Sequence, residues 1–397
     1  SNGLEKRPKL RFPGFDEPWK GTTLSALFSK STQKNADGHI TNVICNSAKL
    51  GLIPQREYFD KDIANSDNTS GYYIIRQNDF VYNPRKSSDA PYGPISSYKY
   101  AEDGIVSPLY LCFHAKDKIN PLYYEWYFRS SAWHRYIYMS GDSGARHDRV
   151  SIKDDTFFAM PINLPSEQEQ SKIASFLQSL DDRIAAQEKL VASLKKYKRG
   201  VNNQILSQID NSYNCRLGSV CEIVGGGTPD TLHTEYWGNT VEWFTPSEIG
   251  KTKYVNNSVR KLSDIGLDNS SAKLLPIGTV LLTTRATLGE MSIAKQECST
   301  NQGFQSLIPH TDRVSSEYLY YMQIIIKPWC EKYASGNTFR EISKSALSDC
   351  IIPIPDRARQ EQIVKLLSSI DLIIGGAESI SMSLSKIRHG LMQQLFI

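Results

Sequence analysis

The sequence predicts an α+β fold in which two mixed, strand-rich domains alternate with two long helices that pair as an antiparallel coiled coil. The chain has 397 residues, enough for roughly two to four ordinary domains. Two segments with a helical spacing of apolar residues repeat at an offset of 190 residues, as Pro165 and Pro355 show. The regions outside these segments are rich in Tyr, Thr, Ser and Gly and contain short apolar runs that are typical of strands. A repeat of this kind predicts pseudo-twofold symmetry in the fold.

The repeat aligns residues 162–206 with residues 352–396 without a gap. Polar and glycine positions are kept as well as apolar ones: Gln170 pairs with Gln360, Asp181 with Asp371, and Gly200 with Gly390. Two unrelated amphipathic helices would share the spacing of apolar residues, but not polar residues and glycines in one register. We therefore interpret the two segments as copies of one structural unit.

Each copy is expected to form a helix of about 40 residues, ~60 Å long at ~1.5 Å per residue. Pro165 and Pro355 stand just ahead of the helices, where proline is tolerated. Ser166 is the expected N-cap of the first helix, with Glu169 completing a capping box, and Asp356 is the expected cap of the second.

Apolar residues at alternating steps of three and four give each predicted helix a seam, and the nearest long seam for one helix is the other. Copies related by a twofold axis run in opposite directions, so we expect antiparallel pairing. The alternative is that each helix packs on the domain before it. Gly200, Gly390 and the pair Gly375-Gly376 are positions where the helices could break.

The repeats divide the chain into four predicted segments: a first domain over residues 10–164, a helical region over 165–208, a second domain over 209–354 and a second helical region over 355–397. Strands are expected over residues 104–113 and 278–284, which are runs of β-branched and apolar residues that begin at glycine. Each domain closes with a Ser-Gly loop that contains an arginine, Arg146 in the first and Arg340 in the second.

Composition and motifs weigh against several classes of function. The net charge of +4 permits an acidic partner without requiring one. No apolar run is long enough to span a membrane, and the start at Ser1-Asn2-Gly3 shows no signal core.

The seven cysteines are scattered without a CxxC pair, so neither a disulfide framework nor a metal site is expected, and a cytoplasmic location fits. The run Gly225-Gly226-Gly227 lacks the rest of a P-loop, and no GxSxG or HExxH motif is present. The sequence therefore predicts no catalytic residue and no cofactor.

Several motifs occur in a doubled order. In the second half they are Gly227-Thr228-Pro229 followed by Tyr236-Trp237-Gly238, Thr284-Arg285 with Asn301-Gln302-Gly303, and Gly336 through Arg340. Counterparts in the first half are Asn83-Pro84-Arg85, Tyr92-Gly93 and Ser107-Pro108, each half ending in its copy of the repeat. This organisation resembles the specificity subunit of a Type I restriction-modification system over nearly the whole chain. The first domain departs from the family pattern because it lacks a Gly-Thr-Pro opening, which leaves its boundaries less defined.

The resemblance implies a DNA-recognition protein without catalysis of its own. Each of the two domains would be a target recognition domain that recognises one half of a split DNA site, and because the domains differ the site would be asymmetric. The helices would set the spacing of the half-sites and bind methyltransferase (modification) subunits. Motor-nuclease (restriction) subunits could join that complex.

The candidate DNA contacts are arginines and amides, which can pair with base edges or phosphates. They are Asn83, Arg85, Lys86, Arg146, Arg149, Arg285, Asn301, Gln302, Asn337, Thr338 and Arg340. Surface salt bridges for the arginines and loop-stitching hydrogen bonds for the amides are the structural alternatives, of about equal weight.

The candidate partner contacts lie on the repeated helices: Gln170, Ile173, Leu177, Gln360, Ile363 and Leu367. Asp181 and Asp371 are expected to form a hydrogen bond between helix and domain. Two other functions stay open at this point. One is an unrelated scaffold that binds proteins through its helices, and the other is an enzyme whose catalytic residues have no recognisable motif.

Overall fold

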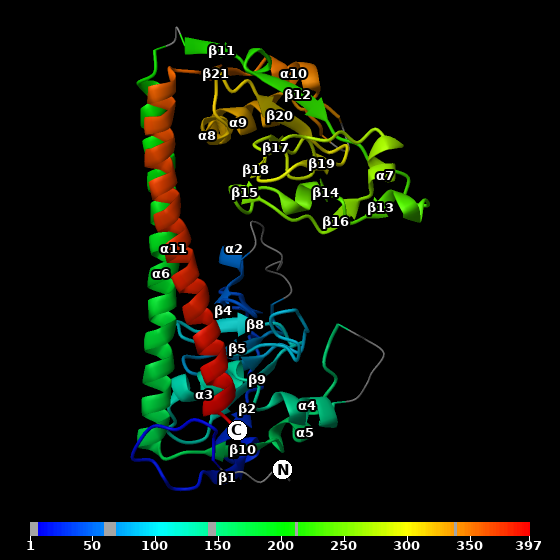
Figure 1. Cartoon of the computed structure of the whole chain (residues 1–397). Helices are drawn as coiled ribbons and strands as arrows, with labels where there is room; N and C mark the ends of the chain where they lie inside the picture. The colour runs from blue at the N-terminus through cyan, green and yellow to red at the C-terminus, as the bar shows by residue number, and fades with distance from the viewer. Residues whose placement is uncertain (1–6, 59–68, 142–147, 211–212, 337–339) are drawn as a thin grey trace. The chain divides into compact units, whose positions relative to one another are not determined.

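The computed structural model describes residues 7–58, 69–141, 148–210, 213–336 and 340–397. The chain forms two compact units (Figure 1). The first unit is Ser1–Glu188 with Ser379–Ile397, and the second unit is Lys189–Glu378. This division falls inside the two long helices, whereas the four predicted segments end at the ends of the helices.

The first unit is built on short antiparallel strands. Its four-stranded sheet has the order β2 (Phe28–Lys30), β9 (Leu111–Ala115), β6 (Phe80–Tyr82) and β7 (Ile95–Ser97). Three two-stranded pairs accompany it: β1 (Lys20–Thr23) with β10 (Pro161–Leu164), β3 (Ile44–Ser47) with β4 (Gly51–Pro54), and β5 (Tyr73–Ile75) with β8 (Gly104–Val106). Its core is aromatic, because the rings of Phe28, Phe80 and Phe113 contact one another at centroid distances of 5.3–5.6 Å.

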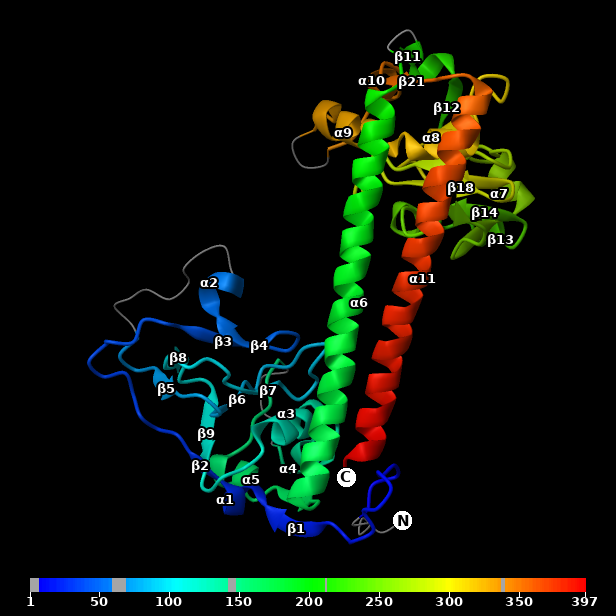
Figure 2. The same cartoon turned by 90° about the vertical axis from the view of Figure 1, so that its left-hand side faces the viewer.

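The short helices that the structure describes in the first unit are α1 (Leu24–Leu27), α2 (Gln55–Tyr58), α3 (Pro121–Arg129), α4 (His134–Ser140) and α5 (Asp154–Phe158). Helix α3 is capped by Asn120, whose side chain accepts a hydrogen bond from the Tyr123 N–H. Tyr123 and Tyr127 of α3 are buried in one core with residues of the first long helix, beside which α3 lies in both views (Figure 2).

The second unit contains a five-stranded sheet and a four-stranded sheet. One has the order β12 (Cys221–Gly225), β20 (Gln305–Pro309), β17 (Val280–Leu282), β18 (Met291–Ala294) and β15 (Tyr254–Val255). The other has the order β13 (Trp237–Gly238), β16 (Arg260–Leu262), β14 (Val241–Phe244) and β19 (Cys298–Thr300). A separate pair joins β11 (Asn214–Arg216) to β21 (Ile351–Pro353), and the helices are α7 (Asp264–Asp268), α8 (Ser316–Tyr321), α9 (Gln323–Tyr333) and α10 (Lys344–Ser348). Among the described residues, single 3-10 turns occur at η3 (Leu217–Ser219), η4 (Thr234–Tyr236) and η5 (Pro246–Glu248).

The predicted strand over residues 278–284 is confirmed as β17. The prediction of one strand over residues 104–113 is wrong, because β8 and β9 are separated by a turn in which the Tyr110 N–H donates to the Ser107 carbonyl over 3.0 Å. Pro108 lies in that turn and has no N–H to donate to a ladder, which explains why the run cannot continue as a single strand.

The two predicted long helices are confirmed as α6 (Glu167–Ser207) and α11 (Arg357–Leu395). Neither breaks at its glycines. The Glu169 N–H donates to the Ser166 hydroxyl over 3.3 Å and the Arg359 N–H donates to the Asp356 carboxylate over 2.8 Å, so both expected caps are present. The Glu169 carboxylate does not complete the capping box, because it accepts two hydrogen bonds from Arg11 instead, at 2.7 and 2.8 Å.

Both units are assembled in the same way at the helix ends. In the first unit β1 pairs antiparallel with β10, the strand just before α6, and in the second unit β11 pairs antiparallel with β21, the strand just before α11. The first core takes in Ile173 and Leu177 from α6 together with Leu395 from α11. The second core takes in Ile205 from α6 and Leu367 from α11. Each long helix therefore belongs half to one unit and half to the other.

Ion pairs join the two long helices within each unit. In the first unit Arg388 donates to Asp181, and in the second unit Lys198 lies 2.5 Å from Asp371 and Lys195 lies 2.7 Å from Glu378. Each helix also packs on its own preceding domain, as the alternative to helix pairing expects. None of the described helices combines the length and the apolar character needed to cross a membrane.

Candidate nucleic-acid interface

Two candidate segments of the first unit, far apart in sequence, meet directly after strand β6. Arg85 and Arg149 face each other in an isolated antiparallel bridge. Backbone hydrogen bonds on either side hold this bridge: the Lys86 N–H donates to the Asp148 carbonyl over 2.9 Å, and the Val150 N–H donates to the Pro84 carbonyl over 2.8 Å. The loop after β6 and the segment before α5 thus form one wall of a hollow.

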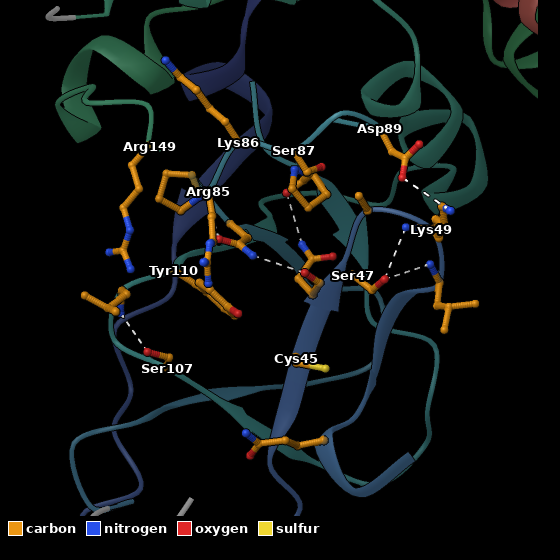
Figure 3. Close-up of a pocket in the computed structure, with 18 residues that line it drawn as sticks. Cys45, Ser47, Lys49, Arg85, Lys86, Ser87, Asp89, Ser107, Tyr110 and Arg149 are labelled. Carbon is orange, nitrogen blue, oxygen red and sulfur yellow. Dashed lines mark hydrogen bonds and ion pairs between the residues drawn. The ribbon is translucent and has the colours of Figure 1, made fainter. Parts of the chain in front are cut away.

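This hollow has a volume of about 820 Å³ and is lined by residues of both segments and of the β3–β4 hairpin. The charged residues in its lining are Lys49, Arg85, Lys86, Arg149 and Asp89. Figure 3 shows the side chains of Arg85 and Arg149 directed into the hollow above Tyr110, whereas Lys86 points away from it. The Asp89 carboxylate lies 3.7 Å from the Lys49 ammonium on another side of the hollow. We call this feature, lined by residues 45–50, 83–87 and 109–110 with Gln55, Asp89, Pro94, Ser107 and Arg149, the first-unit hollow.

Asn83 has a structural place at the edge of the first-unit hollow. Its side-chain NH₂ donates to the Asn46 carbonyl over 3.2 Å, and its side-chain oxygen accepts from the Arg85 N–H over 3.1 Å. Asn46 is itself buried and donates to the Val81 carbonyl over 2.8 Å. These amides hold the loop that carries Arg85, as the loop-stitching alternative expects.

The charges of the two arginines act on the Tyr110 phenol in the first-unit hollow. Burial raises the pKa of the Tyr110 phenol, and the positive charges of Arg149 and Arg85 oppose that rise. Both guanidinium groups therefore lie within electrostatic reach of the Tyr110 hydroxyl. The Nε atom of Arg149 is buried and has no hydrogen-bond partner among the atoms that the structure describes.

In the second unit the structure brings Arg285, Asn301 and Gln302 to one place. The Thr284 N–H donates to the Gly303 carbonyl over 2.9 Å, which joins the segment before Arg285 to the turn at residues 301–303. A Cβ atom on Gly303 would lie 2.9 Å from the Pro246 ring, 3.0 Å from the Asn301 side-chain oxygen and 3.2 Å from the Arg285 Nε atom, so the turn, Asn301 and Arg285 are closely packed here. The exposed Gln302 accepts a hydrogen bond from the Thr228 hydroxyl, in the Gly-Thr-Pro motif.

Arg340 is exposed and lies near the same turn. Its guanidinium donates to the Glu331 carbonyl over 2.5 Å, and Thr284 accepts a backbone hydrogen bond from Ile342, two residues further along. Three other candidates, Arg146, Asn337 and Thr338, lie outside the described residues. The structure thus gathers the remaining candidates into one group in each unit.

Two residues with suitable chemistry are not among the contacts predicted from the sequence. Lys49 lies at the turn of the β3–β4 hairpin and reaches the first-unit hollow. In the second unit the guanidinium of Arg260 stacks 3.4 Å from the centre of the Trp237 ring, and Trp243 is close by. A turn signal between two short apolar runs points to the hairpin, but no sequence signal pairs Arg260 with a tryptophan.

The six candidate partner contacts are buried in the chain's own cores. Ile173, Leu177, Ile363 and Leu367 are each 2% exposed or less. The Gln170 side chain donates to the Pro165 carbonyl, and the Gln360 side chain donates to the Pro355 and Arg313 carbonyls. That these residues contact a partner stays a prediction, and their burial argues against it.

The expected hydrogen bond between helix and domain is confirmed for Asp371, whereas Asp181 makes only an ion pair with its domain. Asp371 accepts a hydrogen bond from the Tyr321 hydroxyl on α8 over 2.8 Å, and Asp181 lies 3.6 Å from Arg129 on α3. Each aspartate also forms an ion pair with the other long helix: Asp371 with Lys198, and Asp181 with Arg388. Lys198 and Arg388 occupy equivalent positions of the repeat.

Across the described ranges, no group of three His, Cys, Asp or Glu side chains is arranged to hold a metal ion. Burial raises the pKa of the Cys112, Cys221 and Cys298 thiols to about 12, so these thiols stay protonated and are poor nucleophiles at neutral pH.

Two stretches of the chain, residues 28–196 and 210–379, match the family model of the Type I restriction modification DNA specificity domain. The Type I restriction enzyme MjaIX specificity subunit of Methanocaldococcus jannaschii is 34% identical over 186 residues, which are 46% of this chain and 43% of that protein. The EcoR124I/EcoR124II specificity subunit of Escherichia coli is 26% identical over 57% of this chain and 59% of that protein. The chain thus spans about half the length of these curated relatives.

Solved structures resemble the whole chain in fold. One belongs to a study of complex assembly and conformational transition of the type I R-M system, with a TM-score of 0.64 and 18% identity over 98% of this chain and 99% of that chain. Another is the HsdS subunit from Thermoanaerobacter tengcongensis, with a TM-score of 0.51 and 20% identity over 99% of both chains.

Proposed function

Since the chain belongs to the family of Type I restriction modification DNA specificity domains, we propose that it is the DNA-recognition subunit of a Type I restriction-modification complex. The observation that carries the proposal is the doubling. Two copies of the family domain coincide with two compact units, each of which gathers arginines and amides into one group. The chain itself catalyses no step in this proposal, and its place of action is the cytoplasm, where the DNA and the partner subunits are.

Each unit carries one target recognition domain for one half of a split DNA site. In the first domain the proposed contacts surround Arg85 and Arg149, and in the second they surround Arg285, Gln302 and Arg340. Arginine suits both base edges and phosphates, since its guanidinium presents a fork of donors. Because the two groups contain different residues, the two half-sites should differ and the whole site should be asymmetric.

The long helices pair as an antiparallel coiled coil and set the distance between the half-sites. Support comes from two ion pairs, Asp181 with Arg388 and Asp371 with Lys198. In the repeat Asp181 corresponds to Asp371, and Lys198 corresponds to Arg388. The two ion pairs therefore join equivalent positions, with the roles of α6 and α11 exchanged. Pairs of that kind are what a twofold relation between the two copies produces. Successive turns of B-DNA are ~34 Å apart, so a fixed spacing selects one gap length between half-sites.

The partners in the proposal are double-stranded DNA, methyltransferase (modification) subunits and motor-nuclease (restriction) subunits. The surface for the methyltransferase subunits is better sought on exposed residues of the long helices than on the six buried candidates. Large apolar side chains there are 47–78% exposed: Leu190, Leu366, Leu372, Ile373, Ile380, Met382 and Ile387. Exposed apolar side chains that recur along a helix are suited to burial against a partner.

Sequencing of methylated bases in the host genome, with and without the gene for this chain, tests the proposed function. We expect one split, asymmetric methylated motif to disappear when the gene is removed. A genome whose methylated motifs are unchanged contradicts the proposal and favours a scaffold that binds only proteins. Cleavage or modification of DNA by the isolated chain would instead favour an enzyme.

A further inference from the structure

We propose that Arg85 and Arg149 form a clamp that holds a single backbone phosphate of the DNA bound by the first unit. The proposal rests on the proposed DNA recognition and deepens it, because it assigns the pair to positioning of the duplex rather than to recognition of a base. Three features support the clamp: the placement of the two side chains, their missing counter-charge and the shape of the first-unit hollow.

The placement of the two arginines is fixed by the backbone. They are direct partners in an antiparallel bridge, so their side chains leave the same face and their Cβ atoms are roughly 5 Å apart. Both guanidinium groups are directed into the first-unit hollow (Figure 3). Like charges directly opposite each other across such a bridge are destabilising, so the arrangement has a cost in the absence of a ligand.

The described residues supply no counter-charge. Neither guanidinium group forms an ion pair or a hydrogen bond within the part of the chain that the structure describes, and the Arg149 Nε atom is buried without a partner. The acid in the lining, Asp89, lies beside Lys49. The Tyr110 phenol adds no negative charge at neutral pH, since burial raises its pKa. An anion between the two arginines would remove the repulsion and satisfy the buried donor.

A phosphate fits this arrangement better than a base. A guanine edge is neutral and is satisfied by the fork of one arginine, whereas a phosphate carries a full charge and offers oxygens to two guanidinium groups. Base edges lie at the floor of a groove and are reached by side chains that protrude, but the sugar-phosphate backbone is the convex part of a duplex. A hollow of about 820 Å³ receives a convex ridge. The neighbouring amides of Asn83 and Asn46 are occupied by hydrogen bonds within the protein.

The test uses the full chain with Arg85→Gln, Arg149→Gln and the double variant. DNA affinity is measured at several salt concentrations, and the preferred sequence is determined by selection from a randomised DNA pool. We expect the double variant to bind every sequence about 10-fold or more weakly, because hydrogen bonds to a charged group are lost. Its salt dependence should decrease in slope by about 0.9, the value for one phosphate. The preferred sequence should stay the same.

Three further variants serve as controls. Arg85→Lys and Arg149→Lys keep the charge and should keep most of the affinity, since a phosphate accepts a point charge whereas a bidentate base contact does not. Arg76→Gln changes an arginine outside the first-unit hollow, where it lies 3.5 Å from Asp103, and should leave DNA binding unchanged. Without DNA the double variant should melt at the wild-type temperature or above it, because a repulsion has been removed.

Several results would overturn the clamp. A new base preference at one position of the first half-site would show that the pair recognises a base. A decrease in slope of about 1.8 would show two separate phosphates. If the wild-type chain binds DNA and the double variant binds it equally well, the clamp alone is overturned. If the wild-type chain binds no DNA, the proposed function is overturned and the clamp with it.

Discussion

Replacement of Asp371 by Asn removes one negative charge from the contact between the long helices in the second unit. Asp371 lies 2.5 Å from the Lys198 ammonium and accepts the Tyr321 hydroxyl hydrogen bond. Asparagine has nearly the same shape and keeps an oxygen that can accept from Tyr321. The substitution therefore isolates the charge, and it leaves the cation of Lys198 close to Lys253, whose own pKa is lowered mainly by burial and also by Lys198.

The size of the effect follows from the exposure of the pair. The side chains of Lys198 and Asp371 are 26% and 29% exposed, which places them between a surface pair and a buried one. Exposed pairs contribute about 0–1 kcal/mol, and breaking a buried pair costs about 3–5 kcal/mol. We expect Asp371→Asn to cost about 2 kcal/mol, which corresponds to a decrease of about 4–8 °C in the Tm of a unit of this size.

Glu378→Gln is the matched control, because Glu378 joins the same two helices through Lys195. That pair is 59% and 44% exposed, so its loss should cost less than about 0.5 kcal/mol. Calorimetry of the full chain would measure both variants against wild type. Equal Tm values for Asp371→Asn and Glu378→Gln, or an Asp371→Asn variant that melts like wild type, would refute the reasoning from burial.

Three further predictions concern packing, backbone conformation and spacing. Leu177→Ala, at a side chain with 0% exposure, should cost about 3 kcal/mol and lower the Tm of the first unit, and an unchanged Tm in calorimetry would contradict its place in the core. Gly93→Ala should weaken DNA binding in a titration, because Gly93 has φ +82° and an added Cβ would lie 2.1 Å from the carbonyl oxygen of Asn83, in the loop that carries Arg85. The control is Gly38→Ala, at φ +68° with open space around the added Cβ, and it should bind DNA normally. Insertion of one helical turn, about four residues, into both α6 and α11 should lengthen the gap in the methylated motif and leave both half-sites unchanged, and an unaltered gap would contradict the spacing role.

The sequence was sufficient for the long helices because their signals are local and repeated. Asp356 caps α11 as expected, and the helical pattern shared by the two copies predicts continuous helices in spite of the glycines within them. It was not sufficient for the run over residues 104–113, where the composition favours strand throughout but one proline ends the ladder. Propensity averages over such a run, whereas a single missing donor decides the local structure.

The candidate contacts show a similar limit. Residues such as Ile173 and Gln170 are kept in both copies because both copies need them for their own packing, so repetition alone does not separate a partner surface from a core. Arg85 and Arg149 were chosen by residue type and loop context. Their meeting in one bridge depends on tertiary pairing across more than sixty residues, for which the sequence carries no local signal.

The last turns of α11 are part of the first unit, and this has a consequence for folding during synthesis. Leu395 and Phe396 are 2% and 5% exposed in the core that holds Trp19 and Tyr123, and the Leu10 N–H donates to the Gln394 carbonyl over 3.0 Å. The second unit is continuous in sequence and leaves the ribosome before these residues do. The core of the first unit is therefore completed only after translation has passed residue 396. Until then, part of that core is open to chaperones and proteases.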